Sequence, residues 1–124
     1  MRSAAAVIKG VQWINDQEVV VTLQGVLRMA SVCAPRRQLL QLARKGPTVL
    51  VIDLTEVSAI DTAGIAILVE VLRAMHACGG KLRLTGLTDQ VKRMVELTSL
   101  DQVLEVYDSM HAEYSSKRDD VSAS

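Results

Sequence analysis

Aromatic side chains are scarce in this sequence, which has no Phe, one Trp and two Tyr among its 124 residues. Hydrophobic residues nevertheless make up 49% of the chain, an ordinary share for a globular protein. We therefore expect an aliphatic core. A chain of this length suits a single domain that can bury a core without disulfides or metals.

An excess of charge of either sign is also lacking, because 14 basic side chains balance 14 acidic ones. Proteins that bind nucleic acids normally carry a basic excess that neutralises phosphates. We therefore expect no nucleic-acid partner. One local basic group has helical spacing and predicts a solvent-exposed helix face; it consists of Arg36, Arg37, Arg44 and Lys45.

Cysteines and long apolar runs are few. Cys33 and Cys78 have no C-x-x-C spacing, and no secretory signal is evident, which predicts free thiols in a reducing cytosol. No stretch approaches the roughly 20 apolar residues that span a bilayer. These features predict a soluble, cytoplasmic protein without direct membrane insertion.

Motifs of catalysis and metal binding are missing as well. His76 and His111 have no Cys or acidic companion at metal-ligand spacing, and no phosphate-binding loop, dinucleotide motif or nucleophile elbow occurs. Asp53 ends an apolar run, as the acceptor Asp of receiver domains does, but the acidic pair that would hold Mg²⁺ is absent. We expect no catalytic residue, metal or cofactor, and expect Asp53 to accept hydrogen bonds from backbone N–H groups.

Hydrophobic periodicity predicts two opening strands followed by alternating helices and strands. Strands are predicted at 11–14, 19–23, 48–53, 81–85 and 103–107, with a loop at 54–60 and Gly25 closing the second strand. Helices are predicted at about 31–45, 65–78, 89–98 and 108–115. This order indicates an α/β domain with a mixed sheet of four to five strands and helices packed mainly on one face.

Several residues predict where the helices begin and end. Asp61 or Thr62 can cap the helix that follows, and Thr88 or Asp89 can cap the next one. The pair at 79–80 is Gly-Gly, which is typical of a helix C-terminus. We expect one domain over residues 1–115 and a flexible polar tail over 116–124. Trp13 is expected to pack against the sheet, with partner contact as the alternative.

The segment 52–66, which contains Asp-Thr-Ala-Gly at 61–64, resembles the signature of the STAS domain, the fold of bacterial anti-sigma factor antagonists. The similarity continues through 79–84, 86–88 and 97–103 and covers about 11–112. It implies a STAS fold and a protein-binding module without enzymatic activity. The implied partner is an anti-sigma factor, which is often also a regulatory Ser/Thr kinase.

The resemblance also implies a set of partner-binding residues around the loop-to-helix junction. These are Asp53, Ser58, Asp61, Thr62, Ala63, Gly64 and Ile65. In the family the kinase usually phosphorylates the Ser or Thr just before the Gly, and the added charge switches binding off. Here Ala63 occupies that position and has no hydroxyl, so Thr62 is the candidate phosphorylation site. Arg28 replaces an acid that the family often carries, which would change which partner fits.

The Asp-Thr-small-Gly motif is also similar to the small STAS subunit of ABC systems that move phospholipid between bacterial membranes. That resemblance implies a different partner, the ATPase subunit of the transporter. A third interpretation is scaffolding in a stressosome. The first two interpretations share the surface around Thr62 and differ in what binds it. An enzyme of unknown type is the last alternative.

Overall fold

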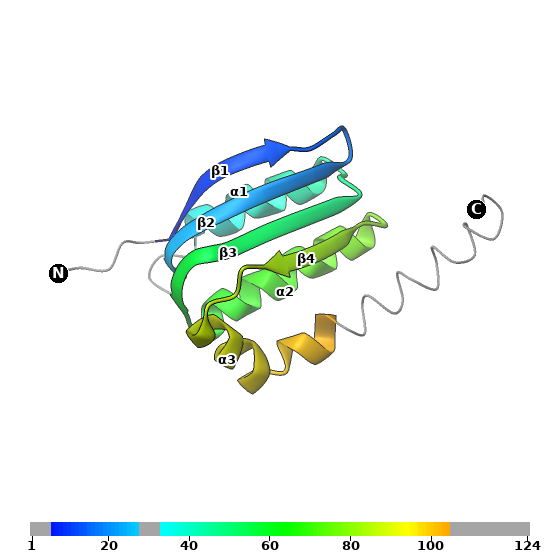
Figure 1. The fold of residues 1–124 in the computed structure, drawn as a ribbon. Coiled ribbons are helices and arrows are strands. Elements are labelled where there is room, and N and C mark those ends of the chain that lie inside the picture. Colours follow the sequence, from blue (N-terminus) through cyan, green and yellow to red (C-terminus); the bar gives the residue numbers. More distant parts are fainter. Residues whose placement is uncertain (1–5, 28–32, 105–124) are drawn as a thin grey trace.

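The computed structural model of the chain describes residues 6–27 and 33–104. Within these residues one sheet has the strand order β1-β2-β3-β4. The strands are β1 (Val7–Trp13), β2 (Glu18–Leu27), β3 (Val49–Ile60) and β4 (Lys81–Thr85). β1 runs antiparallel to β2, whereas β2, β3 and β4 are parallel (Figure 1). The expected mixed sheet is confirmed.

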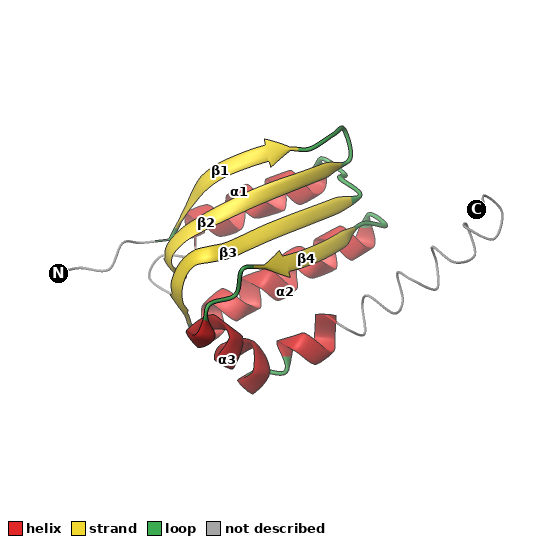
Figure 2. Cartoon of the chain, viewed as in Figure 1, coloured by secondary structure: helices red, strands yellow, loops and turns green. Residues whose placement is uncertain are grey.

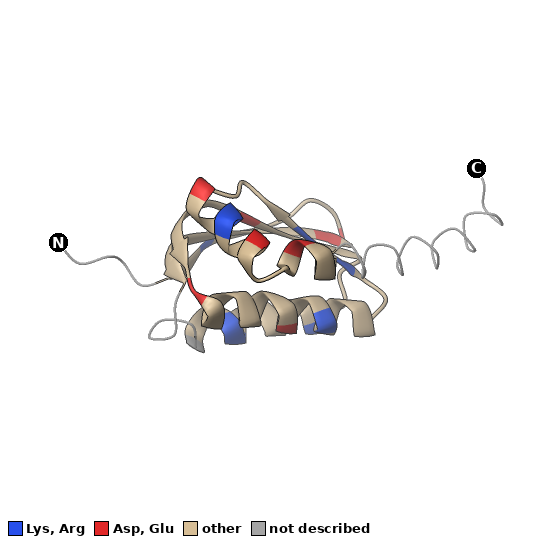
Figure 3. Ribbon diagram, turned by 90° about the horizontal axis from the view of Figure 1, so that it is seen from below, with Lys and Arg blue, Asp and Glu red and all other residues tan. Residues whose placement is uncertain are grey.

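Two helices cover one face of this sheet. The helices are α1 (Cys33–Arg44), α2 (Thr62–Ala77) and α3 (Asp89–Leu97), and residues 100–104 are also helical. Figures 1 and 2 show α1 and α2 side by side behind the strands, and in Figure 3 they form a second layer. α3 lies near the β4 edge and contacts β3. The prediction of helices mainly on one face is confirmed.

The core between the two layers is aliphatic. Val19, Val21 and Leu23 are fully buried, whereas Val20 and Thr22 between them are half-buried, as the two-residue period of a strand requires. Burial of each such side chain stabilises the fold by about 1.5–3 kcal/mol. Other fully buried side chains are Leu39, Leu50, Ile52, Leu54, Val57, Leu68, Val71 and Met75.

Two predicted strand ends are wrong because β2 and β3 are longer than their sequences suggest. β3 continues through the expected loop at 54–60, and β2 continues past Gly25 to Leu27. The pairing of β2 with β3 is irregular between Thr22 and Gln24 and again between Gly25 and Val26, and at each point β3 has one extra residue. Such β-bulges break the alternation of polar and apolar residues without ending the strand.

The predicted strand at 103–107 is also wrong where it can be checked, because 103–104 are helical. Ser99 has a positive φ of 59°, after which the Val103 N–H donates to the Ser99 carbonyl at 3.1 Å. Leu100 is buried, and Val103 packs against the core from the same turn. Residues 105–107, the helix expected at 108–115 and the expected tail at 116–124 lie outside the described residues.

Candidate functional site

The junction between β3 and α2 is built around Asp61. Its Oδ1 accepts a hydrogen bond from the Gly64 N–H at 3.0 Å, so Asp61 is the N-cap of α2. The Asp61 N–H donates to the Leu27 carbonyl at 3.1 Å. These two bonds fix the start of α2 against the end of β2. Of the two cap candidates in the sequence, the structure selects Asp61 and makes Thr62 the first helical residue.

Gly64 brings the backbone of α2 close to β2. A Cβ at this position would lie 2.5 Å from Ile60 Cγ1 and 2.5 Å from the Leu27 oxygen. Both separations are far shorter than van der Waals contact, so a side chain cannot be accommodated without a shift. Glycine is disfavoured inside helices, so its presence in this first turn is a signal of close approach that the sequence analysis did not use.

The five expected site residues at 61–65 divide into an outer and an inner group. Thr62 is exposed, and Asp61 and Ala63 are half-buried. Gly64 and Ile65 are buried, Ile65 with 6% of its surface exposed. The outer surface of the junction therefore consists of Asp61, Thr62 and Ala63, while Gly64 and Ile65 hold the helix start in place.

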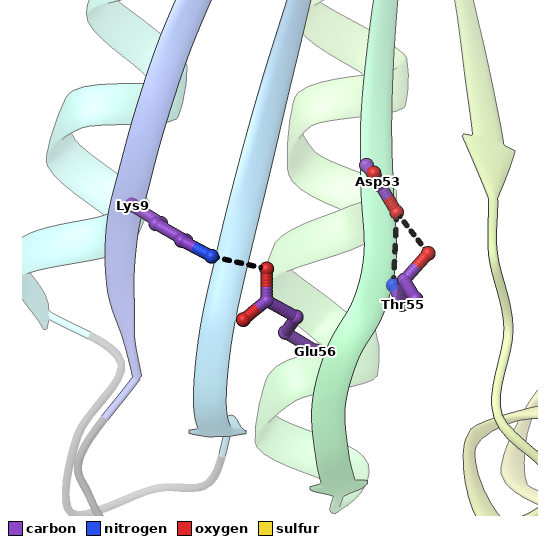
Figure 4. Close-up of polar contacts among 4 residues, drawn as sticks. All are labelled: Lys9, Asp53, Thr55 and Glu56. Carbon is purple, nitrogen blue, oxygen red and sulfur yellow. Dashed lines mark hydrogen bonds and ion pairs between the residues drawn. The ribbon is translucent and has the colours of Figure 1, made fainter.

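Asp53 lies away from this junction, on the sheet face opposite the helices. Its Oδ1 accepts from the Thr55 N–H at 2.9 Å and from the Thr55 hydroxyl at 2.5 Å (Figure 4). These bonds lower the pKa of Asp53, the hydroxyl bond contributing most. The expectation that Asp53 accepts backbone hydrogen bonds is confirmed, but the bonds stabilise a bulge within β3. Ser58 is exposed in β3 nearer the junction.

An ion pair joins α1 to α2 on the outer side of the helix layer. Arg36 Nε donates to Glu70 Oε1 at 2.8 Å and Arg36 Nη2 to Glu70 Oε2 at 2.7 Å. This bidentate geometry lowers the pKa of Glu70. Arg36 is exposed as expected, but its partner could not be inferred from spacing, because the two residues are far apart in the sequence. Charges of both signs are distributed over this layer in Figure 3.

Two other kinds of feature, a metal-binding group and a membrane-spanning helix, are not found in the described ranges. Over residues 6–27 and 33–104 no three His, Cys, Asp or Glu side chains are grouped so that they could hold a metal ion. None of the helices described is both long and apolar enough to cross a membrane. Arg28 lies in the undescribed segment 28–32.

Comparisons with known proteins agree with this architecture. A crystal structure of an anti-sigma factor antagonist from Mycobacterium paratuberculosis superimposes with a TM-score of 0.71 at 23% identity, covering 80% of this chain and 82% of that chain. The anti-sigma-B factor antagonist of Bacillus subtilis is 27% identical over 92 residues, which are 74% of this chain and 84% of that protein. Two relatives from Thermotoga species match over 70 residues, and the chain spans 62% of their length.

The family model described as "Mlab, STAS domain" matches residues 12–105, well over half of the chain. The match contains β2, β3 and β4 in full but only Gln12 and Trp13 of β1, and it contains the complete junction at Asp61. The chain belongs to this STAS domain family.

Proposed function

We propose that this protein is an anti-sigma factor antagonist that binds an anti-sigma factor or a related regulatory Ser/Thr kinase. The relative from Bacillus subtilis has that name. The observation that carries the proposal is the capped start of α2, where Thr62 is exposed beside Asp61 and Ala63. Such a partner would place the protein in the cytoplasm.

The contact centre would be the outer group of Asp61, Thr62 and Ala63, with Ser58 at its margin. Gly64 and Ile65 would support this surface without touching the partner, because both are buried and keep the first turn of α2 close to β2. A rigid helix start favours affinity, since fewer conformations are lost on binding. Asp53 would contribute indirectly, by stabilising the bulge at Thr55.

Thr62 is the residue through which the complex would be regulated. The position before Gly64 is Ala63, which has no hydroxyl, whereas Thr62 is exposed and next to it. A phosphate on Thr62 would add about −1.5 to −2 charges at the interface. The helix N-terminus tolerates that anion within the free chain, so the charge would weaken the complex without unfolding the protein.

Calorimetric titration of the purified partner with Thr62→Glu tests the proposal. We expect affinity to fall more than about tenfold, which corresponds to about 1.4 kcal/mol. Gln90→Glu is the matched control, because it places the same charge in the first turn of α3, and it should bind like the wild type. Wild-type affinity of Thr62→Glu would remove the start of α2 from the interface.

The second candidate function is that of a STAS subunit bound to the ATPase of a phospholipid-transport ABC system. It is favoured by Ala63, because a chain without a hydroxyl before Gly64 lacks the usual acceptor of the phosphorylation switch. Two measurements separate the candidates. Transfer of radiolabelled phosphate from a partner kinase to the wild type, lost in Thr62→Val, supports the antagonist. Co-purification with an ABC ATPase, without any labelling, supports the transport subunit.

A further inference from the structure

β1 is an edge strand with an apolar surface. Over the described residues it pairs with β2 alone, so its outer edge is open (Figure 1). Val11 and Trp13 are 45% and 39% exposed, and Ile14, which follows the strand, is 57% exposed. Exposed edges of this kind are usually protected in natural proteins because they can pair with another strand.

The hydrogen-bond pattern shows which backbone groups point outward. The Ile14 N–H donates to the Glu18 carbonyl at 2.8 Å, while the Glu18 N–H turns to Asn15 Oδ1 at 2.9 Å, so these two residues occupy a hydrogen-bonded position at the end of the ladder. In an antiparallel ladder such pairs alternate with non-bonded pairs. The residues opposite Val19 and Val21, which are Trp13 and Val11, therefore direct their N–H and C=O groups away from β2.

The one charge within β1 does not protect its edge. Lys9 is the charged residue of β1, and its Nζ lies 2.7 Å from Glu56 Oε2, an ion pair that reaches across β2 to β3 (Figure 4). The pairing of β1 with β2 shifts between Ile8 and Gly10, so Lys9 is the extra residue of a bulge. The stretch from Gly10 to Ile14 beyond the bulge is regular and uncharged.

We propose that the β1 edge binds a second copy of this chain, as an antiparallel pair of β1 strands that extends the sheet across a two-fold axis. Among protein partners, an extended strand is the one that matches the spacing of the outward donors and acceptors of Val11 and Trp13. The second copy supplies such a strand with the same outward groups. Lys9 of one β1 strand does not repel Lys9 of the other, because its ammonium is neutralised within its own chain.

Symmetry and sequence select one register. A two-fold axis perpendicular to the sheet places one residue opposite itself, because cross-strand neighbours must point to the same face. An axis at Gln12 places Val11 of one copy opposite Trp13 of the other, a pairing of a β-branched with an aromatic side chain that is favourable. The same axis places Ile14 opposite Gly10, where a Cβ would meet no atom within 4 Å. An axis at Val11 would instead place Trp13 opposite the bulged Lys9.

Sedimentation over a concentration series tests the pairing. We expect the wild type to move from the 13.5 kDa monomer towards twice that mass. Val11→Pro should remain a monomer with an unchanged melting temperature, because Pro is tolerated on an edge where the lost N–H points to solvent. Trp13→Lys should weaken self-association at least about tenfold. Leu97→Lys, at a site 73% exposed on α3, is the matched control and should dimerise normally.

Disulfide trapping tests the register. In the Gln12-centred pair the two copies of residue 12 form a non-bonded pair with Cα atoms about 4.5 Å apart, within the range that a disulfide bridges. Gln12→Cys, with Cys33→Ser and Cys78→Ser, should form a covalent dimer under mild oxidation, and Leu97→Cys in the same background should not. A wild type that stays monomeric at every concentration overturns the proposal. The proposal is also overturned if Val11→Pro and Trp13→Lys both leave the dimer intact. The same holds if these two variants weaken only the binding of the anti-sigma factor or kinase and not self-association.

Discussion

The starts of α2 and α3 use the same cap but meet the sheet differently. Asp61 accepts from the Gly64 N–H at 3.0 Å, and Thr88 accepts from the Val91 N–H at 3.4 Å. In both helices the bonded residue, three positions after the cap, is buried. At α2 that residue is glycine and the backbone itself touches β2, whereas at α3 the Val91 side chain fills the space.

This difference separates two roles that a helix start can have. A capping side chain determines where the helix begins, and both helices have one. The residue three positions after the cap determines whether backbone or side chain makes the contact below the helix start. α3 has a further bond to the sheet, in which the Thr88 hydroxyl donates to the Val57 carbonyl at 3.1 Å.

Among the variants at the two helix starts, Gly64→Ala should lower the free energy of unfolding most. The added methyl would lie 2.5 Å from both Ile60 Cγ1 and the Leu27 oxygen, and relieving such overpacking costs about 1–3 kcal/mol. Urea denaturation should show this loss in the free energy of unfolding. Gly10→Ala is the control, since no atom lies within 4 Å of its Cβ position. Equal midpoints for the two variants would mean that α2 is not held by backbone contact.

Removing either cap should have an intermediate effect. Asp61→Ala and Thr88→Ala should each lower the free energy of unfolding by about 1 kcal/mol, the usual cost of a lost N-cap. Thr88→Ala should be the more damaging of the two, because it also removes the bond to Val57. Asp61→Asn should restore most of the stability, since an amide oxygen also caps. Asp61→Asn as unstable as Asp61→Ala would show that the charge, and not the cap, matters.

A charge added to either helix start should have a smaller and opposite effect on stability. Thr62→Glu and Gln90→Glu each place a carboxylate in a first turn, where the helix dipole favours it by about 0.3–1 kcal/mol. Thermal melting at low salt should show both variants slightly stabilised, and high salt should reduce the gain. Thr62→Glu would then combine weaker partner binding with unimpaired folding. Destabilisation by Thr62→Glu alone would attribute its binding defect to the fold.

Loss of the hydrogen bonds to Asp53 should change stability least. This carboxylate accepts its bonds within a strand and not at a helix start. Its folded pKa lies below the ordinary 3.8 because of the two bonds from Thr55. Its contribution to stability is therefore complete above pH 3.8 and is lost as the pH falls through the lower, folded pKa. Thr55→Val should raise the pKa of Asp53, as measured by carboxyl-carbon NMR titration. An unchanged titration would show that the Thr55 hydroxyl is not the main cause.

The sequence predicted those parts of the fold that local chemistry determines. The break before Gly46, the end of α2 near Gly79 and the caps at Asp61 and Thr88 follow from single residues whose conformational preferences are strong. The STAS motif likewise identified the family. The residues of this motif at 61–65 lie at one junction, as the motif implied. The motif could not show which of them are exposed and which are buried, because that depends on how closely β2 approaches.

Long-range pairing determined the parts that the sequence did not predict. Polar residues after Asp53 suggested a loop, yet β2 supplies the pairing partners that keep 54–60 in a strand. The same limitation hid the ion pair between Arg36 and Glu70, because no spacing rule relates two helices. Val103 is a β-prone residue, yet it lies in a helical turn that follows the positive φ of Ser99. In each case a distant or neighbouring backbone overrides the local pattern.

The two bulges of β3 allow residues three positions apart to lie on the same side of the sheet, where the residues of a regular strand would alternate. β3 has one extra residue opposite β2 at each bulge, and Leu54, Val57 and Ile60 are all buried. Deletion of one residue between Leu54 and Val57, or between Val57 and Ile60, would remove a bulge and restore regular alternation, so the buried residues would keep their side of the sheet. A one-residue slip in the regular part of the strand would instead exchange its two faces. β3 can therefore lose a residue at either bulge, but not in its regular part, without exposing its buried side chains.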